Sequence, residues 1–221
     1  MPNQPVEDRR RALRPTADRA GRAPPPLTVP TRVFVVTGPS GAGKGTLIAR
    51  LLARVPELEL AVSATTRRRR PSEVDGREYW FLTDEEFDRR LAEGDFLEWV
   101  RFPWGQRSGT LRSEIDRIGS NGRVPVLELE LEGAKTVRDE VPGSYTIFVD
   151  APIAELERRL WERATESQGE IGERVAMARD QREEAGEFHA IVLNDDLERA
   201  VSELEKVVRG QLEGVGRLSR T

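Results

Sequence analysis

Short runs of β-branched and aliphatic residues alternate along this chain with longer stretches whose apolar positions recur at helical spacing. The short runs predict buried strands at 32–37, 124–131, 145–149 and 190–193. The helical spacing predicts helices at 46–52, 84–93, 111–118, 153–163, 170–184 and 197–212, the first of them ended by Pro56. This alternation predicts an α/β fold, a mostly parallel sheet with helices on both faces.

The polar segment 63–122 interrupts this alternation and reads as an insertion over the sheet. Residues 1–30 hold six arginines, three acids and a run of three prolines, so we expect a disordered, solvated arm. The rest divides into one folded domain, 31–209, and a C-terminal tail, 210–221. Within the domain we expect a core at 31–62, 123–157 and 180–209, the insertion at 63–122 and a lid at 158–179.

Composition narrows the functional classes. The formal net charge of −4 gives no general attraction to nucleic acid or to an anionic membrane, and we expect neither as a partner. The absence of cysteine and the single histidine exclude thiolate chemistry and cysteine or multi-histidine metal sites. No stretch is long and apolar enough to span a bilayer or to act as a secretory signal, so we expect a cytoplasmic protein.

A glycine-rich turn between the strand at 32–37 and the helix at 46–52 has the spacing of a phosphate-binding loop. Glycines let successive backbone N–H groups point at an anion, and the helix N-terminus adds partial positive charge. Only three of the 35 basic residues are lysines, and one of them, Lys44, stands where it would reach the β- and γ-phosphates. An ordinary turn that needs glycines is the alternative. The pattern predicts ATP binding by Gly38, Pro39, Ser40, Gly41, Ala42, Gly43, Lys44, Gly45 and Thr46.

The residue after the lysine departs from the usual Ser or Thr, whose hydroxyl holds Mg²⁺. It is Gly45, followed by Thr46. We expect Mg²⁺ to accompany ATP, held more through water or by Thr46. The Gly-Lys-Gly-Thr sequence is also similar to that of adenylate kinases.

Several further segments together resemble the guanylate kinase family. They are 62–79, 95–99, 108–110, 127–133, 159–166, Arg174 and 194–196, and the resemblance covers nearly everything from residue 32 to about 209. It implies a P-loop nucleoside monophosphate kinase that transfers a phosphoryl group from ATP to GMP or dGMP, in purine metabolism. It leaves open a monomer or a homodimer.

The resemblance also implies the acceptor site. Arginines can hold a monophosphate bidentately and offset its repulsion from ATP. Glu98 would read guanine, because one carboxylate can accept from both N1–H and the N2 amine, whereas adenine offers an acceptor at N1. The implied GMP-binding residues are Ser63, Arg67, Arg70, Glu73, Tyr79, Glu98, Ser108, Thr110 and Glu130.

Two departures affect this site. Ser108 stands where the family often has a tyrosine, and Arg107 is a candidate to replace it as a phosphate ligand. The family's Leu-Asp-x-Asp becomes Leu127-Glu128-Leu129-Glu130, so Glu128 is expected beside the metal through water and Glu130 beside guanine. Arg68 and Arg69 have no implied role and are expected to be exposed.

The segment 158–166 ends one helix and begins a loop. Arg159 and Arg163 share a helix face, and the resemblance implies that they close over the ATP phosphates with Arg174. The catalytic residues implied are Lys44, Arg67, Arg159, Arg163 and Arg174. Asn194 and Asp195 would contact adenine; their alternative is a cap for the following helix.

Two other functions stay open. One is a kinase of the same scaffold that phosphorylates AMP or a sugar phosphate. The other is a non-catalytic, guanylate-kinase-like module that binds proteins; the intact loop glycines and Lys44 argue against it.

Overall fold

The central sheet has five strands in the order β2-β7-β1-β8-β9, and every hydrogen-bonded pair is parallel. The structure is a computed structural model that describes residues 27, 32–102, 105–162 and 168–218. The strands are β1 (Val33–Thr37), β2 (Leu58–Leu60), β7 (Val124–Glu128), β8 (Ser144–Asp150) and β9 (Ala190–Leu193). This confirms the predicted mostly parallel α/β sheet.

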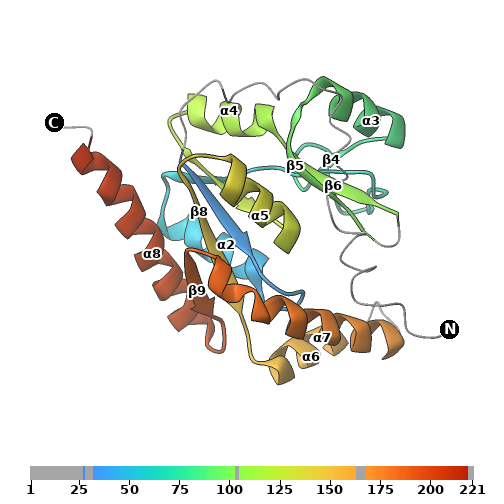
Figure 1. Cartoon of the computed structure of the whole chain (residues 1–221), viewed down its shortest axis with the longest axis vertical. Coiled ribbons are helices and arrows are strands. Elements are labelled where there is room, and N and C mark those ends of the chain that lie inside the picture. The colour runs from blue at the N-terminus through green and yellow to red at the C-terminus, as the bar shows by residue number, and fades with distance from the viewer. Residues whose placement is uncertain (1–26, 28–31, 103–104, 163–167, 219–221) are drawn as a thin grey trace.

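Alternation along β1 explains why helices cover both faces (Figure 1). Phe34 and Val36 point into a core shared with α2 (Lys44–Arg54) and α8 (Leu197–Leu218). Val33 and Val35 point the other way, toward α4 (Arg112–Ser120) and α5 (Leu131–Glu140). All four side chains are fully buried, as expected for a strand in the middle of a two-sided sheet.

The helix α5 was not predicted, and the strand predicted to reach residue 131 is wrong at its end. β7 ends at Glu128, and α5 begins at Leu131. The apolar residues 127, 129 and 131 read as strand alternation, but Leu131, Ala134 and Val137 form the buried stripe of a helix. The edge strand β2 was also missed, because it is only three residues long.

The insertion folds as a second, mostly antiparallel sheet in the order β4-β3-β6-β5. Its elements are β3 (Ala64–Thr65), β4 (Trp80–Phe81), α3 (Asp84–Glu93), β5 (Phe96–Arg101) and β6 (Arg107–Leu111). It has its own small core, in which the Phe87 and Phe96 rings stack with centroids 4.3 Å apart. The sequence predicted an insertion here and its helix at 84–93, but none of its strands.

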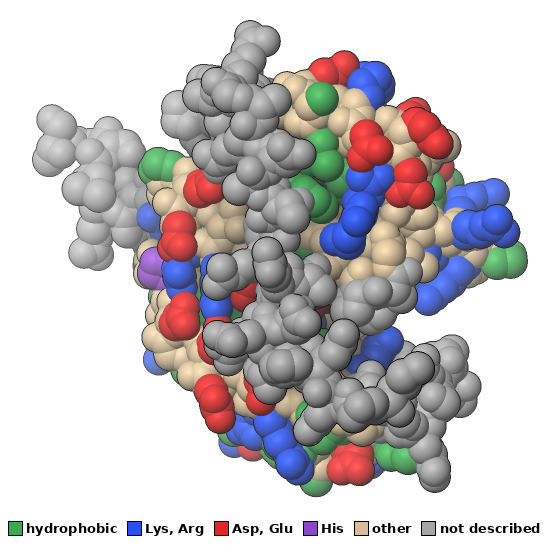
Figure 2. All heavy atoms as spheres, turned by 45° about the vertical axis from the view of Figure 1, so that its right-hand side comes forward, with side chains coloured by type: hydrophobic (Ala, Val, Ile, Leu, Met, Phe, Trp, Pro, Cys, Tyr) green, Lys and Arg blue, Asp and Glu red, His purple; other side chains and the backbone are tan. Residues whose placement is uncertain are grey.

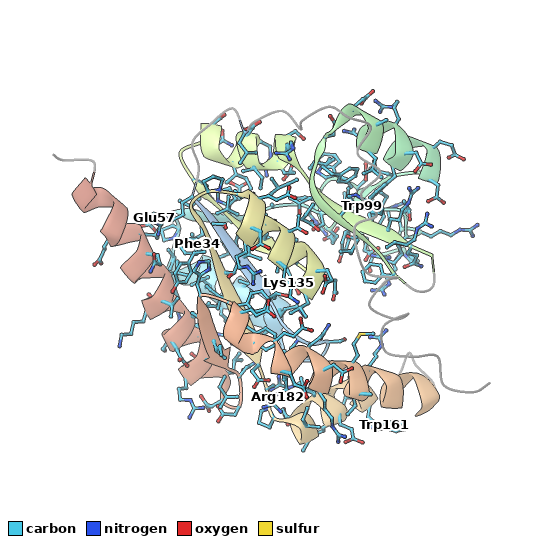
Figure 3. All side chains as sticks on the ribbon, in the orientation of Figure 1. Phe34, Glu57, Trp99, Lys135, Trp161 and Arg182 are labelled. Atoms are coloured by element: carbon cyan, nitrogen blue, oxygen red, sulfur yellow. The ribbon has the colours of Figure 1, made fainter. Side chains whose placement is uncertain are left out.

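The remaining helices lie at the opposite end of the molecule from the insertion (Figure 1). They are α6 (Ile153–Glu162) and α7 (Gln168–Glu183), and a short turn of 3-10 helix, Ala185–Glu187, follows them. Figure 3 shows Trp99 within the insertion and Trp161 on α6, far apart on separate parts of the fold. The last helix, α8, continues to Leu218, six residues beyond its predicted end. Except for Leu27, which packs against the core, the predicted arm 1–30 lies outside the described residues.

Both signs of charge are spread over the surface, and Figure 2 shows acidic and basic side chains interspersed on one face. No helix in the described part of the chain is long and apolar enough to cross a membrane.

Candidate functional site

The candidate site lies where parallel strands end together. The carboxyl ends of β1, β7, β8 and β9 meet at one edge of the sheet, which is where open α/β sheets bind ligands. The glycine-rich loop follows β1, Glu128 ends β7, and Asn194 follows β9. The topology therefore brings predicted donor and acceptor residues to the same edge.

The loop's backbone requires glycine at two tightly packed positions. Gly38 has φ +139°, and a Cβ there would lie 2.1 Å from the carbonyl oxygen of Val149. Gly43 has φ +85°, and its Cβ would lie 2.5 Å from Nδ2 of Asn194. Because L side chains rarely adopt such φ values, these glycines keep the loop curled against β8 and against Asn194, which follows β9.

Lys44 begins α2 and folds back over the loop. Its Nζ donates to the carbonyl oxygens of Gly38 at 2.8 Å and Pro39 at 3.3 Å. The ammonium group therefore lies over the curled backbone that would surround a phosphate.

Three side chains brace the loop from outside. The buried Asn194 donates from Nδ2 to the Ala42 carbonyl oxygen at 2.7 Å. Arg159 Nη1 donates to the Gly41 and Ala42 carbonyl oxygens at 3.3 Å each, while its Nε donates to Glu155 at 2.8 Å. Two of the three predicted lid arginines thus reach the loop, since Arg174 Nη1 also donates to Ser40 Oγ at 3.3 Å. The third, Arg163, lies outside the described residues.

The two residues predicted on the adenine side differ in their surroundings. Asn194 Oδ1 is buried and has no hydrogen-bond partner among the described residues. Asp195 is exposed, and its pairing with Arg199 lowers the pKa of its carboxyl group. The residue that caps α8 is Asp196, whose Oδ1 accepts from the Arg199 backbone N–H at 2.9 Å.

On the insertion, Arg67 and Glu73 form a bidentate ion pair. Arg67 Nη2 donates to Glu73 Oε1 at 2.8 Å, and Nη1 donates to Oε2 at 3.0 Å. Glu73 also accepts from the Arg70 backbone N–H at 2.8 Å. The hydrogen bonds from Arg67 and then from Arg70 lower the pKa of Glu73 to about 2. Arg68, Arg69 and Arg70 are exposed, which confirms the exposure expected of the first two.

Tyr79 lies beside this pair. Its ring lies 5.2 Å from the guanidinium carbon of Arg67. Burial, and then the charge of Glu128, raise the pKa of its phenol; the charge of Glu130 contributes in the same direction. Glu128 also faces the loop, since its Oε2 lies 3.5 Å from the Cβ position of Gly45. The Glu128 carboxylate therefore lies between the start of α2 and the insertion.

Glu98 is buried where the insertion meets α5. It is 5% exposed, and its Oε1 accepts from Thr110 Oγ1 at 2.9 Å. Burial raises the pKa of Glu98 to about 7, against the opposing hydrogen bonds from Thr110. Gly133, in the first turn of α5, makes room for this carboxylate: a Cβ there would lie 2.5 Å from Glu98 Oε2.

The expectation that Arg107 is a phosphate ligand is wrong. Its guanidinium is buried against α3, donating to Asp84 at 2.7 Å and to Asp88, and lies 4.5 Å from the Phe87 ring centroid. The cause is strand alternation, which turns Arg107 toward the insertion's own helix. Ser108, on the other face of β6, donates from Oγ to the Ala64 carbonyl oxygen at 3.1 Å. Ser63, just before β3, accepts through its carbonyl oxygen from the Trp80 N–H at 2.9 Å.

Comparison with known proteins agrees with this geometry. A family model described as "Guanylate kinase" matches residues 30–211. The chain belongs to the guanylate kinase family. It is 46% identical over 178 residues to the guanylate kinase of Synechococcus elongatus, covering 80% of this chain and 97% of that protein. The Rubrobacter xylanophilus guanylate kinase is also 46% identical, with 80% and 93% covered.

The fold agrees as well. The crystal structure of guanylate kinase from Anaplasma phagocytophilum superposes with a TM-score of 0.65 at 22% identity, covering 83% of this chain and 86% of that one. Membership of the guanylate kinase family makes the chain an enzyme, an ATP-dependent nucleoside monophosphate kinase. Two contacts of this kinase were not foreseen: Asn194 bracing the loop and Gly133 accommodating Glu98. Neither is visible in sequence, because each joins segments far apart in the chain.

Proposed function

We propose that the sheet edge holds ATP at the glycine-rich loop and GMP at the insertion, and that the γ-phosphoryl group passes between them. The reaction is that of the guanylate kinase family, ATP and GMP giving ADP and GDP, with dGMP as a second acceptor. The observation that supports this division is the position of Glu128. Its carboxylate lies against Gly45 of the loop, and its charge acts on Tyr79 beside Arg67.

On the donor side, the loop 38–46 surrounds the ATP phosphates and Lys44 neutralises charge on the β- and γ-phosphates. Arg159, Arg163 and Arg174 stabilise the transferring group, which in a loose transition state carries charge on its equatorial oxygens. The contacts of Arg159 and Arg174 with the loop support this role. Asn194 and Asp195 contact adenine in this proposal, and Asn194 also keeps the loop in shape.

On the acceptor side, Arg67, Arg70 and Tyr79 aim the GMP phosphate, with Ser63 and Ser108 nearby. Glu98 accepts from N1–H and the N2 amine of guanine, and Thr110 lies beside O6. The burial of Glu98 supports its role in reading the base. Among the described residues its carboxylate accepts hydrogen bonds from Thr110 alone, so a ligand that offers two further donors would stabilise the buried charge. Glu130, whose charge raises the pKa of Glu98, lies on the same side.

Mg²⁺ fits the residues at the loop. It keeps several waters and takes one or two carboxylates together with phosphate oxygens, so it needs no cluster of three acidic ligands. No such cluster occurs in the described part of the chain. Glu128 and the exposed Thr46 at the start of α2 would hold it, chiefly through water. When bound with ATP, Mg²⁺ supplies neutralisation of charge on the β- and γ-phosphates.

The decisive assay measures ADP release with GMP, AMP, CMP and UMP as acceptors. We expect GMP to be used far better than the others, because adenine presents an acceptor to Glu98. Activity with AMP exceeding that with GMP would favour the alternative, a kinase of the same scaffold with another acceptor.

Lys44→Ala should abolish turnover, whereas Lys206→Ala, on the exposed face of α8, should not. Turnover that survives Lys44→Ala would contradict the donor site. A cytoplasmic location and a monomer or homodimer stay predictions.

A further inference from the structure

The guanidinium group of Arg67 has five N–H donors, and the structure shows how three of them are used. The two that face outward between Nη1 and Nη2 bind the carboxylate of Glu73. The second hydrogen of Nη1 binds the Arg68 carbonyl oxygen at 2.9 Å. Among the described residues, this leaves the Nε hydrogen and the second Nη2 hydrogen, which lie side by side on one edge of the group.

That remaining edge has a fixed direction. The guanidinium carbon lies 5.2 Å from the Tyr79 ring centroid and 5.5 Å from that of Phe81. Rotation of the group would break the bidentate pair as well as these ring contacts. The remaining edge therefore presents two parallel donors, the arrangement that binds two oxygens of a phosphate.

Glu73 is itself held in place. Its Oε2 accepts from the Arg70 backbone N–H at 2.8 Å, and its own N–H donates to the Arg70 carbonyl oxygen at 3.1 Å. Arg69 donates to the Glu73 carbonyl oxygen at 2.6 Å. The side chain is almost fully buried, and its lowered pKa keeps it ionised at neutral pH.

We propose that Glu73 is a positioning residue for the acceptor phosphate: it occupies one edge of Arg67 so that the Nε edge alone receives the phosphate. This rests on the proposed function of Arg67, and it replaces the expectation that Glu73 binds GMP directly. An ionised carboxylate repels a phosphate that carries about two negative charges, so it is unsuited to be a ligand. Both of its oxygens are already engaged by donors of the loop.

The role matters for rate more than for affinity. Phosphoryl transfer needs the attacking oxygen in line with the leaving group, and a displacement of about 1 Å can cost about 100-fold in rate. Without Glu73, Arg67 still attracts the phosphate, because its positive charge is then no longer neutralised by a neighbouring carboxylate. The phosphate could then bind to several edges of the guanidinium group, only one of which aims it correctly.

The experiment compares Glu73→Gln with Glu78→Gln. Glutamine cannot pair bidentately, because its amide N–H₂ would face an Arg67 donor. Glu78 is a matched control in the same loop: it accepts from the Val74 backbone N–H at 2.6 Å and from Arg77 Nε at 2.7 Å, without touching Arg67. We expect Glu73→Gln to lower kcat about 10- to 100-fold while the Kd for GMP changes less than about threefold. Glu78→Gln should change neither.

A double-mutant cycle adds a readout that a structural role would not give. In Arg67→Lys there is no guanidinium group whose edge Glu73 could occupy. Adding Glu73→Gln to Arg67→Lys should therefore lower kcat further by less than about threefold. The proposal is overturned if Glu73→Gln costs the same in both backgrounds, if its kcat matches that of Glu78→Gln, or if Kd rises as much as kcat falls. A wild-type protein with no GMP kinase activity would instead refute the proposed function.

Discussion

The burial of Glu98 leads to a prediction about stability as well as function. In the folded chain the pKa of Glu98 is raised from its usual 4.5 to about 7, chiefly by burial. The folded state therefore loses stability as pH rises from 4.5 through 7. The difference between the two pKa values corresponds to a loss of about 3 kcal/mol in the free energy of unfolding above pH 7, because each pKa unit is worth about 1.4 kcal/mol. Glu98→Gln removes the buried charge and keeps an oxygen that can accept from Thr110.

We expect Glu98→Gln to raise the free energy of unfolding by up to about 3 kcal/mol at pH 8, and by less than about 1 kcal/mol at pH 5. Urea denaturation at the two pH values measures this. Glu114→Gln is the control with the opposite sign. Burial alone would raise the pKa of Glu114, but hydrogen bonds from Arg117 and the Val62 N–H lower it, so this variant should lose stability at pH 8.

The same variant tests base reading. Loss of one bidentate pair costs about 1–3 kcal/mol, so kcat/KM for GMP should fall by about 5- to 150-fold, while the affinity for ATP stays unchanged. Since only the ionised carboxylate accepts twice, wild-type affinity for GMP should also fall below pH 7 more steeply than that of Glu98→Gln. A variant that is no more stable at pH 8, or that loses ATP and GMP equally, would refute the reasoning.

Two further predictions concern the phosphate loop. Gly38→Ala should weaken ATP binding and lower Tm, because its Cβ would meet the Val149 carbonyl oxygen at 2.1 Å. The control Gly122→Ala, at a positive φ but with open space around it, should cost only the backbone strain of about 1–3 kcal/mol. Equal losses of stability in the two variants would contradict this account. Asn194→Asp should raise KM for ATP more than Asn194→Ala does, because it places a carboxylate oxygen against the Ala42 carbonyl oxygen. Steady-state kinetics measure the two KM values. The reverse order would mean that Asn194 does not hold the loop.

The parts of the fold that sequence predicted are those specified locally. The phosphate loop was predicted because glycine spacing, a flanking strand and a flanking helix all lie within one short segment. The helix α3 was predicted for the same reason; Thr83 and Glu86 form its capping box within the same turn.

The parts that escaped prediction depend on distant segments. The start of α5 was predicted as the end of a strand, because apolar and polar residues alternate from 127 to 131. The strand β7 ends within this segment, and the last residue of the segment begins a helix. The strands β3 and β4 are two residues each, too short to leave a pattern. Arg107 was only a candidate phosphate ligand, and two acids on α3 hold it instead. Only the pairing of β6 with its neighbours decides which way its side chain points.

The most direct test is a crystal structure with GMP and a non-hydrolysable ATP analogue bound together. We predict that the GMP phosphate lies within hydrogen-bonding distance of Arg67 Nε and of Arg70, with guanine N1–H on Glu98. The β- and γ-phosphates of the analogue should lie against Lys44. Arg67 and Arg70 directed into solvent, with no bound anion near them, would contradict the account.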